Sequence, residues 1–164
     1  MSYVARDDRP ADKAARYTEL EAEILAVLDG EPNLMARMAT VSSMLADAFP
    51  GFFWTGFYLV DPHKQDELVV GPYQGTLGCL RIAFGRGVCG TAARDRATQI
   101  VEDVNAFPGH IACDSRSASE IGGPGLDRAG RLIAVLDVDA TEIGAFDAVD
   151  AEALERLMAR VFAA

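Results

Sequence analysis

The spacing of hydrophobic residues along this chain predicts helices at both ends and strands between them. Apolar positions recur with the helical period over residues 17–28 and again over 33–49. The chain closes on a third amphipathic run, 154–162, with Asp147 or Asp150 available to cap its start. We therefore expect two helices in the first part of the chain and one at its end.

The middle of the chain changes to aromatic and β-branched runs bounded by turn formers, which is typical of strands. The predicted strands are 52–60, 67–71, 79–83, 98–101 and 131–139. This order favours an α+β fold, in which the N- and C-terminal helices pack together on one face of a mainly antiparallel sheet and loops cover the other. Because no repeat or linker divides the chain, we expect a polar lead-in over 1–15 and a single domain over 16–164.

The composition is that of one globular domain with a strong negative charge. A chain of 164 residues, half of them hydrophobic, buries roughly 70% of its unfolded surface in one core. The net charge of −10, from 25 acidic and 15 basic side chains, opposes binding to nucleic acid and to anionic membranes. The first residues lack the apolar core of a signal peptide, so we expect a cytoplasmic protein whose cysteines are reduced at rest.

Three cysteines are the first candidates for chemistry. Cys79, Cys89 and Cys113 are separated by 9 and 23 residues, and the chain holds two histidines, His63 and His110. Zinc sites usually contain paired ligands a few residues apart, and the sequence has no such pair, so we expect no metal. Inert buried thiols are an alternative, because free cysteine is among the most buried residue types.

The setting of Cys113 favours a reactive thiol over an inert one. Turn formers surround it in the segment 107–115, and a loop thiol is accessible. His110 either lowers the pKa of this thiol or serves as a hydrogen-bonding loop residue. Cys89 follows the glycine-containing segment 85–88, which matches only part of a dinucleotide fingerprint and favours a turn before a short helix.

Four stretches of the sequence together resemble the signature of one enzyme family. They are GPYQG (71–75), RIAFGRGVCGTAA (81–93), GHIACDSRSASEI (109–121) and AVLDVDA (134–140). These stretches are similar to the free methionine-(R)-sulfoxide reductases, which are built on a GAF domain. Because GAF folds host many functions, the functional expectation depends on the site residues and not on the fold.

The resemblance implies a role for each cysteine. Cys113 would attack the sulfur of free L-methionine-(R)-sulfoxide and become a sulfenic acid as methionine leaves, and Cys79 would then form a disulfide with it. Cys89 would be an auxiliary thiol. Thioredoxin would reduce the enzyme, and no cofactor is implied.

The resemblance also assigns an acidic trio and a tryptophan. Glu120 would keep its proton near pH 7 in a dry pocket and protonate the leaving sulfoxide oxygen, whereas Asp137 and Asp139 would hold the substrate ammonium. From the sequence alone, Asp137 and Asp139 share one face of a strand, which also fits a solvated strand end. Trp54 would pack against the substrate, and the alternative is core packing.

The sequence departs from the family pattern just after Glu120. Three glycines and a proline occupy 122–125, where the family runs an apolar strand, so we expect an irregular edge strand and reduced stability. Two rival functions stay open: a GAF sensor that grips a small ligand with Asp137 and Asp139 and does no chemistry, and a peroxide-reducing thiol protein. By analogy with other GAF domains, a homodimer through the terminal helices is a candidate assembly.

Overall fold

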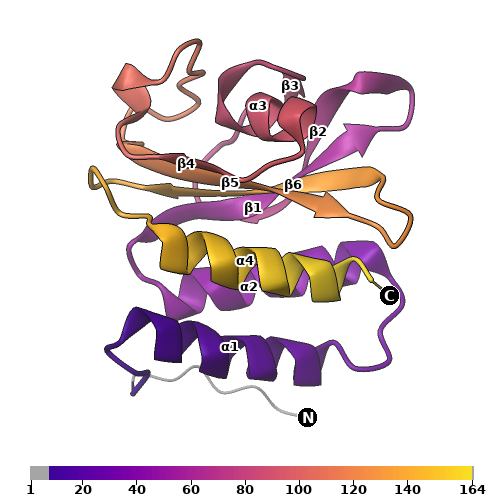
Figure 1. Cartoon of the computed structure of the whole chain (residues 1–164), viewed down its shortest axis with the longest axis vertical. Coiled ribbons are helices and arrows are strands. Elements are labelled where there is room, and N and C mark those ends of the chain that lie inside the picture. The colour runs from indigo at the N-terminus through magenta and orange to yellow at the C-terminus, as the bar shows by residue number, and fades with distance from the viewer. Residues whose placement is uncertain (1–7, 164) are drawn as a thin grey trace.

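The computed structural model describes residues 8–163 and folds them into helices on both sides of one sheet (Figure 1). The helices are α1 (Lys13–Val27), α2 (Leu34–Ala48), α3 (Gly87–Asp95) and α4 (Ala148–Val161), with a 3-10 turn at Val104–Ala106. The strands are β1 (Phe52–Asp61), β2 (Lys64–Gln74), β3 (Arg81–Ala83), β4 (Gln99–Val101), β5 (Ser119–Leu126) and β6 (Leu132–Ala140). Residues 1–7 of the expected lead-in lie outside the described residues. α1 begins at Lys13, which is earlier than the predicted helix and inside the range expected to be the lead-in.

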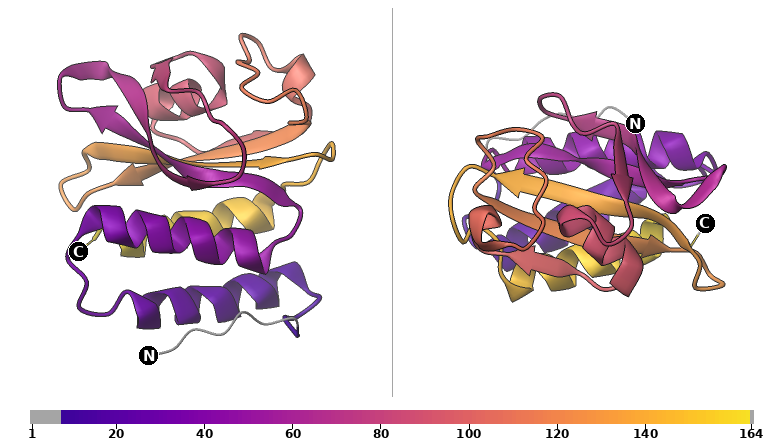
Figure 2. Two further views of the ribbon diagram at one scale, coloured as in Figure 1. Left: turned by 180° about the vertical axis from the view of Figure 1, so that it is seen from behind. Right: turned by 90° about the horizontal axis from the view of Figure 1, so that it is seen from above.

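The six strands form one antiparallel sheet in the order β3-β2-β1-β6-β5-β4. On one face, α2 packs on β1 and β2 while α4 packs on β5, and α1 forms an outer layer against α2 and α4 (Figure 1). The expected α+β architecture is therefore confirmed, with the terminal helices on one side of the sheet. The other face carries α3 and two long loops (Figure 2).

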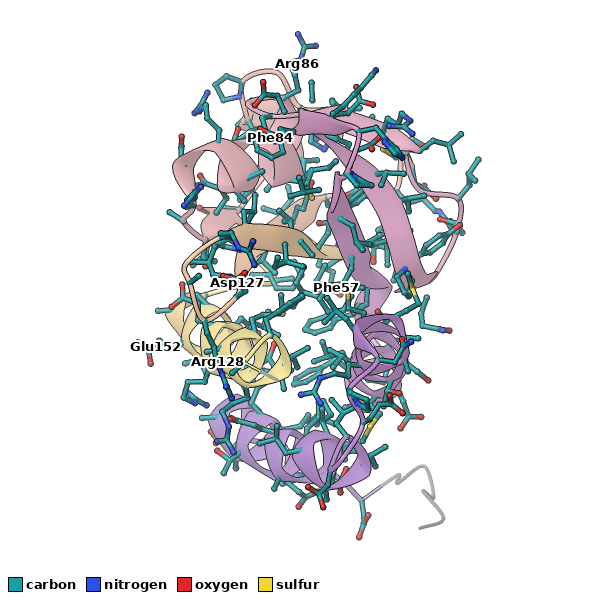
Figure 3. The ribbon with its side chains drawn as sticks, turned by 90° about the vertical axis from the view of Figure 1, so that its right-hand side faces the viewer. Phe57, Phe84, Arg86, Asp127, Arg128 and Glu152 are labelled. Atoms are coloured by element: carbon teal, nitrogen blue, oxygen red, sulfur yellow. A yellow bond between two sulfur atoms is a disulfide. The ribbon has the colours of Figure 1, made fainter. Side chains whose placement is uncertain are left out.

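The main hydrophobic core lies between the sheet and the helices. Phe57 of β1 points from the sheet into this layer, and its ring contacts Phe162 at a centroid distance of 6.1 Å (Figure 3). Leu136 and Val138 of β6 face the same core, whereas Asp137 between them faces the opposite side. Because successive side chains of β6 point to opposite faces, this strand contributes residues both to the core and to the polar face of the sheet.

Both candidate caps of the last helix are used. The side chain of Asp147 accepts backbone hydrogen bonds at the start of α4, and Asp150 bonds back to the amide of Asp147, which completes a capping box. Asp150 also accepts the hydroxyl of Tyr17 at 2.8 Å and the ammonium of Lys13 at 2.7 Å. The cap of α4 therefore ties that helix to α1.

Arg37 joins the C-terminal ends of two helices. Its buried guanidinium donates to the carbonyl oxygens of Leu28 (3.3 Å), Glu31 (2.9 Å), Arg160 (3.3 Å) and Val161 (3.0 Å). These carbonyls lie at and just beyond the ends of α1 and α4, where a helix lacks partners and carries partial negative charge. A single positive side chain from α2 therefore satisfies both helix ends.

The glycine-rich segment 122–125 agrees in part with the irregular edge expected for it. β5 pairs with β6 along its length, but only residues 120–122 also pair with β4, so residues 123–126 lie at the edge of the sheet. The strand is irregular only near Gly125, where the register shifts. A Cβ at Gly125 would lie 2.6 Å from the Phe162 ring, so this glycine makes room for the end of α4. The close contact with Phe162 therefore explains why a glycine stands at position 125.

Candidate active site

The polar face of the sheet carries two rows of residues that the strand register sets side by side. In the first row, Asp139 of β6 lies between Trp54 of β1 and Glu120 of β5. In the second row, Asp137 lies between two glycines of the same two strands, 56 and 122. The sheet register therefore brings together the acidic trio and the tryptophan that the sequence predicted as site residues.

The glycines of the second row let other elements approach Asp137. A Cβ at Gly122 would lie 3.4 Å from the Val88 side chain and 3.8 Å from Cα of Cys89, so α3 packs closely over β5. A Cβ at Gly56 would lie 2.2 Å from Cβ of Tyr73. The carboxyl group of Asp137 is consequently buried beneath α3 instead of lying at a solvated strand end.

A cavity of about 40 Å³ lies above these rows and is lined by residues of α3 and of two loops, 75–80 and 107–118. Figure 2 shows these elements on this side of the sheet. Its polar or reactive lining residues are Trp54, Tyr58, Arg86, Cys89, His110, Cys113, Asp114, Ser117, Glu120, Asp137 and Asp139. Apart from Cys79, every predicted site residue faces this one space.

A disulfide between Cys79 and Cys113 joins the two loops, with the Cα atoms 5.4 Å apart. This pairing is the one that the family resemblance implied. The hydroxyl of Thr76 donates to a carboxylate oxygen of Asp114 at 2.7 Å, which makes a second link between the same loops. Cys79 precedes β3 instead of opening it, so both bonded cysteines lie in loops and not in the sheet, contrary to the strand expected over 79–83.

Trp54 is packed in the core and also lines the cavity. Its indole ring stacks on Tyr73 with centroids 4.9 Å apart and on Tyr58 at 5.6 Å, and the side chain is buried. Its Nε1 donates to the carbonyl of Thr76 at 3.0 Å, which fixes the loop above it. The ring also lines the cavity, so packing holds it as an apolar wall of the site.

Burial raises the pKa of all three carboxyl groups of the acidic trio. Loss of hydration raises the pKa of Glu120 to about 8, helped by the charge of Asp139. The pKa of Asp137 is also raised well above its usual value, by burial and by the charges of Glu120 and Asp139. Burial raises the pKa of Asp139 to about 6, with the Ser117 hydroxyl and His110 opposing the shift. Near pH 7 the site thus holds a protonated Glu120 as a candidate acid.

Cys89 lies at the centre of the same cluster. Its Sγ is 3.7 Å from Oε1 of Glu120, and burial followed by the charge of Asp137 raises the pKa of the thiol. The ligand atoms of Cys89, Glu120 and Asp137 all lie within 4.8 Å of one another, which would suit a metal ion geometrically. Metal binding requires deprotonated ligands, and this buried environment favours their protonated forms.

Two cavity residues have partners that the sequence did not predict. The Nε2 atom of His110 lies 3.6 Å from Oε2 of Glu120, so the nearest acidic partner of this histidine is the buried acid. Ser117 donates its hydroxyl to Asp139. The spacing of residues in the sequence could not predict either contact, because both residues lie in an irregular loop.

Comparisons with known proteins identify the family of this chain. The model of the GAF domain family matches residues 11–164. A free methionine-R-sulfoxide reductase of Escherichia coli is 41% identical over 150 residues, covering 92% of this chain and 88% of that protein. The reductase of the same name from Saccharomyces cerevisiae is 42% identical over 133 residues, covering 79% and 74% respectively. The chain belongs to the free methionine-R-sulfoxide reductase family.

The structural likeness extends to a reductase with its substrate. The free methionine-R-sulfoxide reductase of Neisseria meningitidis, whose crystal structure contains its substrate, superposes with a TM-score of 0.89. The two chains are 46% identical, and the match covers 96% of this chain and 93% of the other. The family resemblance deduced from the four sequence stretches is thereby confirmed. None of the described helices is both long and apolar enough to cross a membrane.

Proposed function

We propose that this protein reduces free L-methionine-(R)-sulfoxide to L-methionine in the cytosol, with Cys113 as nucleophile and Cys79 as resolving thiol. The observation that carries the proposal is the disulfide of these two cysteines at the mouth of a cavity whose floor is the buried acidic trio. Family membership supports the reaction class. Reduction by thioredoxin and homodimerisation are further predictions of the same proposal.

The proposed reaction has three steps. The Cys113 thiolate attacks the sulfoxide sulfur while Glu120 protonates the oxygen, so that methionine leaves and Cys113 carries a sulfenic acid. The Cys79 thiol then attacks the sulfenic sulfur and releases water, forming the disulfide. A dithiol reductant returns two electrons and two protons to the cysteines. Cys89 stays protonated in this scheme and serves as an auxiliary thiol beside Glu120.

The acidic floor supports recognition of a free amino acid. The Oδ1 atom of Asp137 is buried with no hydrogen-bond partner within residues 8–163, and a buried unpaired carboxyl oxygen is costly. An α-ammonium group would supply the missing donor, and its positive charge would favour the ionised form of this carboxyl group. Asp139, on the same face of β6, would share this ammonium, and the apolar face of Trp54 would hold the methyl group.

The size of the cavity implies an order of events. A volume of about 40 Å³ is far below the ~300 Å³ lower limit of ordinary small-molecule sites. The disulfide and the Thr76–Asp114 hydrogen bond hold the two loops over this space. We propose that the disulfide form is the closed product of a turnover and that its reduction lets the loops separate to admit substrate.

A turnover assay tests the proposal directly. The reduced protein is incubated with each diastereomer of free methionine sulfoxide and dithiothreitol, and methionine is measured. The proposal expects steady methionine formation from the (R) form alone. If neither diastereomer is reduced, the protein is not this enzyme and the sensor alternative is favoured. If both are reduced equally, the assigned stereochemistry is wrong.

A further inference from the structure

The two most exposed large apolar side chains within residues 8–163 flank the disulfide. Leu77 is 74% exposed and Leu80 is 70% exposed, and they stand two residues before and one residue after Cys79. Single exposed leucines are ordinary on protein surfaces. Two of them beside a sulfur atom that must be reduced in every catalytic cycle suggest a contact surface.

The backbone of this loop is anchored, so the leucines are held outward. Gly78 between them is buried, and a Cβ there would lie 2.9 Å from the Trp54 ring and 3.1 Å from the Tyr58 hydroxyl. On the other side, the carbonyl of Leu80 accepts the amide of Val70 at 3.0 Å. The segment is thus pressed onto the aromatic pair while both leucine side chains face solvent.

The two sulfur atoms of the disulfide differ in their position. Cys113 lines the cavity, whereas Cys79 does not and lies in the leucine-bearing loop. Cys79 is half-buried and Cys113 is exposed, so the side from which the partner approaches, and not exposure, selects the attacked sulfur. A thiolate that approaches over the leucine-bearing loop reaches Cys79. Displacement at Cys79 would leave the Cys113 sulfur as the thiolate that faces the cavity, ready for the next substrate.

We propose that Leu77 and Leu80 form the docking surface for a protein dithiol reductant that attacks Cys79. This inference rests on the proposed function. The thiolate of the partner bonds to Sγ of Cys79, the Cys79–Cys113 bond breaks, and Cys113 leaves as a thiolate that takes a proton. The second thiol of the partner then attacks the partner's own sulfur in the mixed disulfide. Cys79 is released as a thiol, and the partner leaves as a disulfide with two electrons fewer.

The chemistry and size of the surface favour a transient protein partner. Redox complexes bury less than ~1,200 Å² in total, with an apolar centre inside a polar rim. Two leucines next to the half-exposed Arg81 fit such a centre and rim. They are too few for the larger and more apolar interface of a stable dimer. A dithiol of the thioredoxin type is therefore the expected occupant.

The test compares two reductants on the full chain. Leu80→Asp places a charge in the proposed contact without altering the backbone hydrogen bond of that residue. Thioredoxin probes docking, and dithiothreitol, which needs no protein surface, probes the chemistry. Met35→Asp is the matched control, because Met35 is 51% exposed on α2, beyond the opposite face of the sheet (Figure 1). Circular dichroism confirms that each variant is folded.

We expect Leu80→Asp to lower kcat/KM for thioredoxin at least about tenfold and to leave dithiothreitol-driven turnover within about twofold of the wild type. Met35→Asp should leave both unchanged. Leu77 also lines the cavity, so for Leu77→Asp the readout is the ratio of the two reductants, which should fall in the same direction. Unchanged ratios in both leucine variants would overturn the docking surface. Absence of dithiothreitol-driven turnover in the wild type would instead defeat the proposed function.

A trapping experiment identifies the attacked sulfur. Thioredoxin whose second active-site cysteine is replaced by serine cannot resolve the mixed disulfide, so the adduct accumulates on the oxidised protein. Trypsin places Cys79, Cys89 and Cys113 on separate peptides, 65–81, 87–94 and 97–116. The inference expects the adduct on 65–81. An adduct on 97–116 would show that Cys113 is attacked and would overturn the proposed direction of approach.

Discussion

The imidazole Nε2 of His110 lies 3.6 Å from Oε2 of Glu120, so the loop that carries Cys113 also brings a histidine to the buried acid of the sheet. Cys113 and Glu120 line the same cavity. In the proposed mechanism the nucleophile therefore lies in a loop and the acid in a strand of the sheet.

The raised pKa of Glu120 predicts how activity depends on pH. The acid is active when protonated, so kcat/KM should fall as pH rises through about 8, whereas the nucleophile gains thiolate as pH rises. The result is a bell-shaped profile. Glu120→Gln should lower kcat by about 10² to 10⁴ and remove the fall on the basic side. A variant that kept this fall would contradict the assignment of Glu120 as the acid.

The same shift predicts a pH dependence of stability. Glu120 has an ordinary pKa of 4.5 when unfolded and about 8 when folded, so the folded state holds more protons between these values. The free energy of unfolding should therefore decrease as pH rises through this window. Urea unfolding of the wild type and of Glu120→Gln at about pH 6 and about pH 9 measures this effect. The variant should lose less stability between the two values, and an equal loss would contradict the buried protonated acid.

The two bonded cysteines should behave differently when each is replaced. Cys113→Ser should form no methionine even in one turnover, because a hydroxyl is a far poorer nucleophile than a thiolate. Cys79→Ser should complete one turnover but lose most thioredoxin-driven cycling. Rapid-quench measurement of methionine per enzyme separates these outcomes. Stoichiometric methionine from Cys113→Ser would refute its role.

Replacement of Arg37 should lower the stability of the protein without directly affecting the active site. Arg37→Met keeps much of the side-chain volume but takes the guanidinium away from four backbone carbonyls, of which that of Leu28 keeps the amide of Glu31 as a donor. An unsatisfied buried acceptor costs about 1–3 kcal/mol, so we expect a loss of at least about 3 kcal/mol in the free energy of unfolding. Urea unfolding measures it, with Arg160→Met as the surface control. A loss below about 1 kcal/mol would show that water replaces the guanidinium.

Periodicity was sufficient to predict α1, α2, α4, most of the strands and one face of the site. It did not predict β5, which was expected only from the family resemblance. The alternation around Val138 places Asp137 and Asp139 on one side of β6, and helical spacing located α1, α2 and α4. The cap choice at α4 was also readable from residue types, since both candidate aspartates take part. These features are local, and local spacing carries the physical information that determines them.

Contacts between distant segments were beyond the sequence pattern. The pairing of His110 with Glu120 depends on the path of a loop, which has no periodicity. The four carbonyl groups that bind Arg37 come from segments up to 124 residues away in sequence. The burial of this charged helix residue could therefore not be predicted from its neighbours in the sequence. The role of Gly125 follows from the position of Phe162, and the sequence alone indicated only a weak strand.

The most direct test of the account is whether the site requires a free amino group. N-acetylation removes the ammonium cation that Asp137 and Asp139 would hold, and an unpaired buried carboxylate costs roughly 3–5 kcal/mol, or about 10² to 10⁴ in catalytic efficiency. The measurement is kcat/KM for free L-methionine-(R)-sulfoxide and its N-acetyl form, with the wild type and with Asp137→Asn. We predict at least about a hundredfold preference for the free form in the wild type and a smaller preference in the variant. Comparable values for the two compounds in the wild type would contradict recognition of the free amino acid.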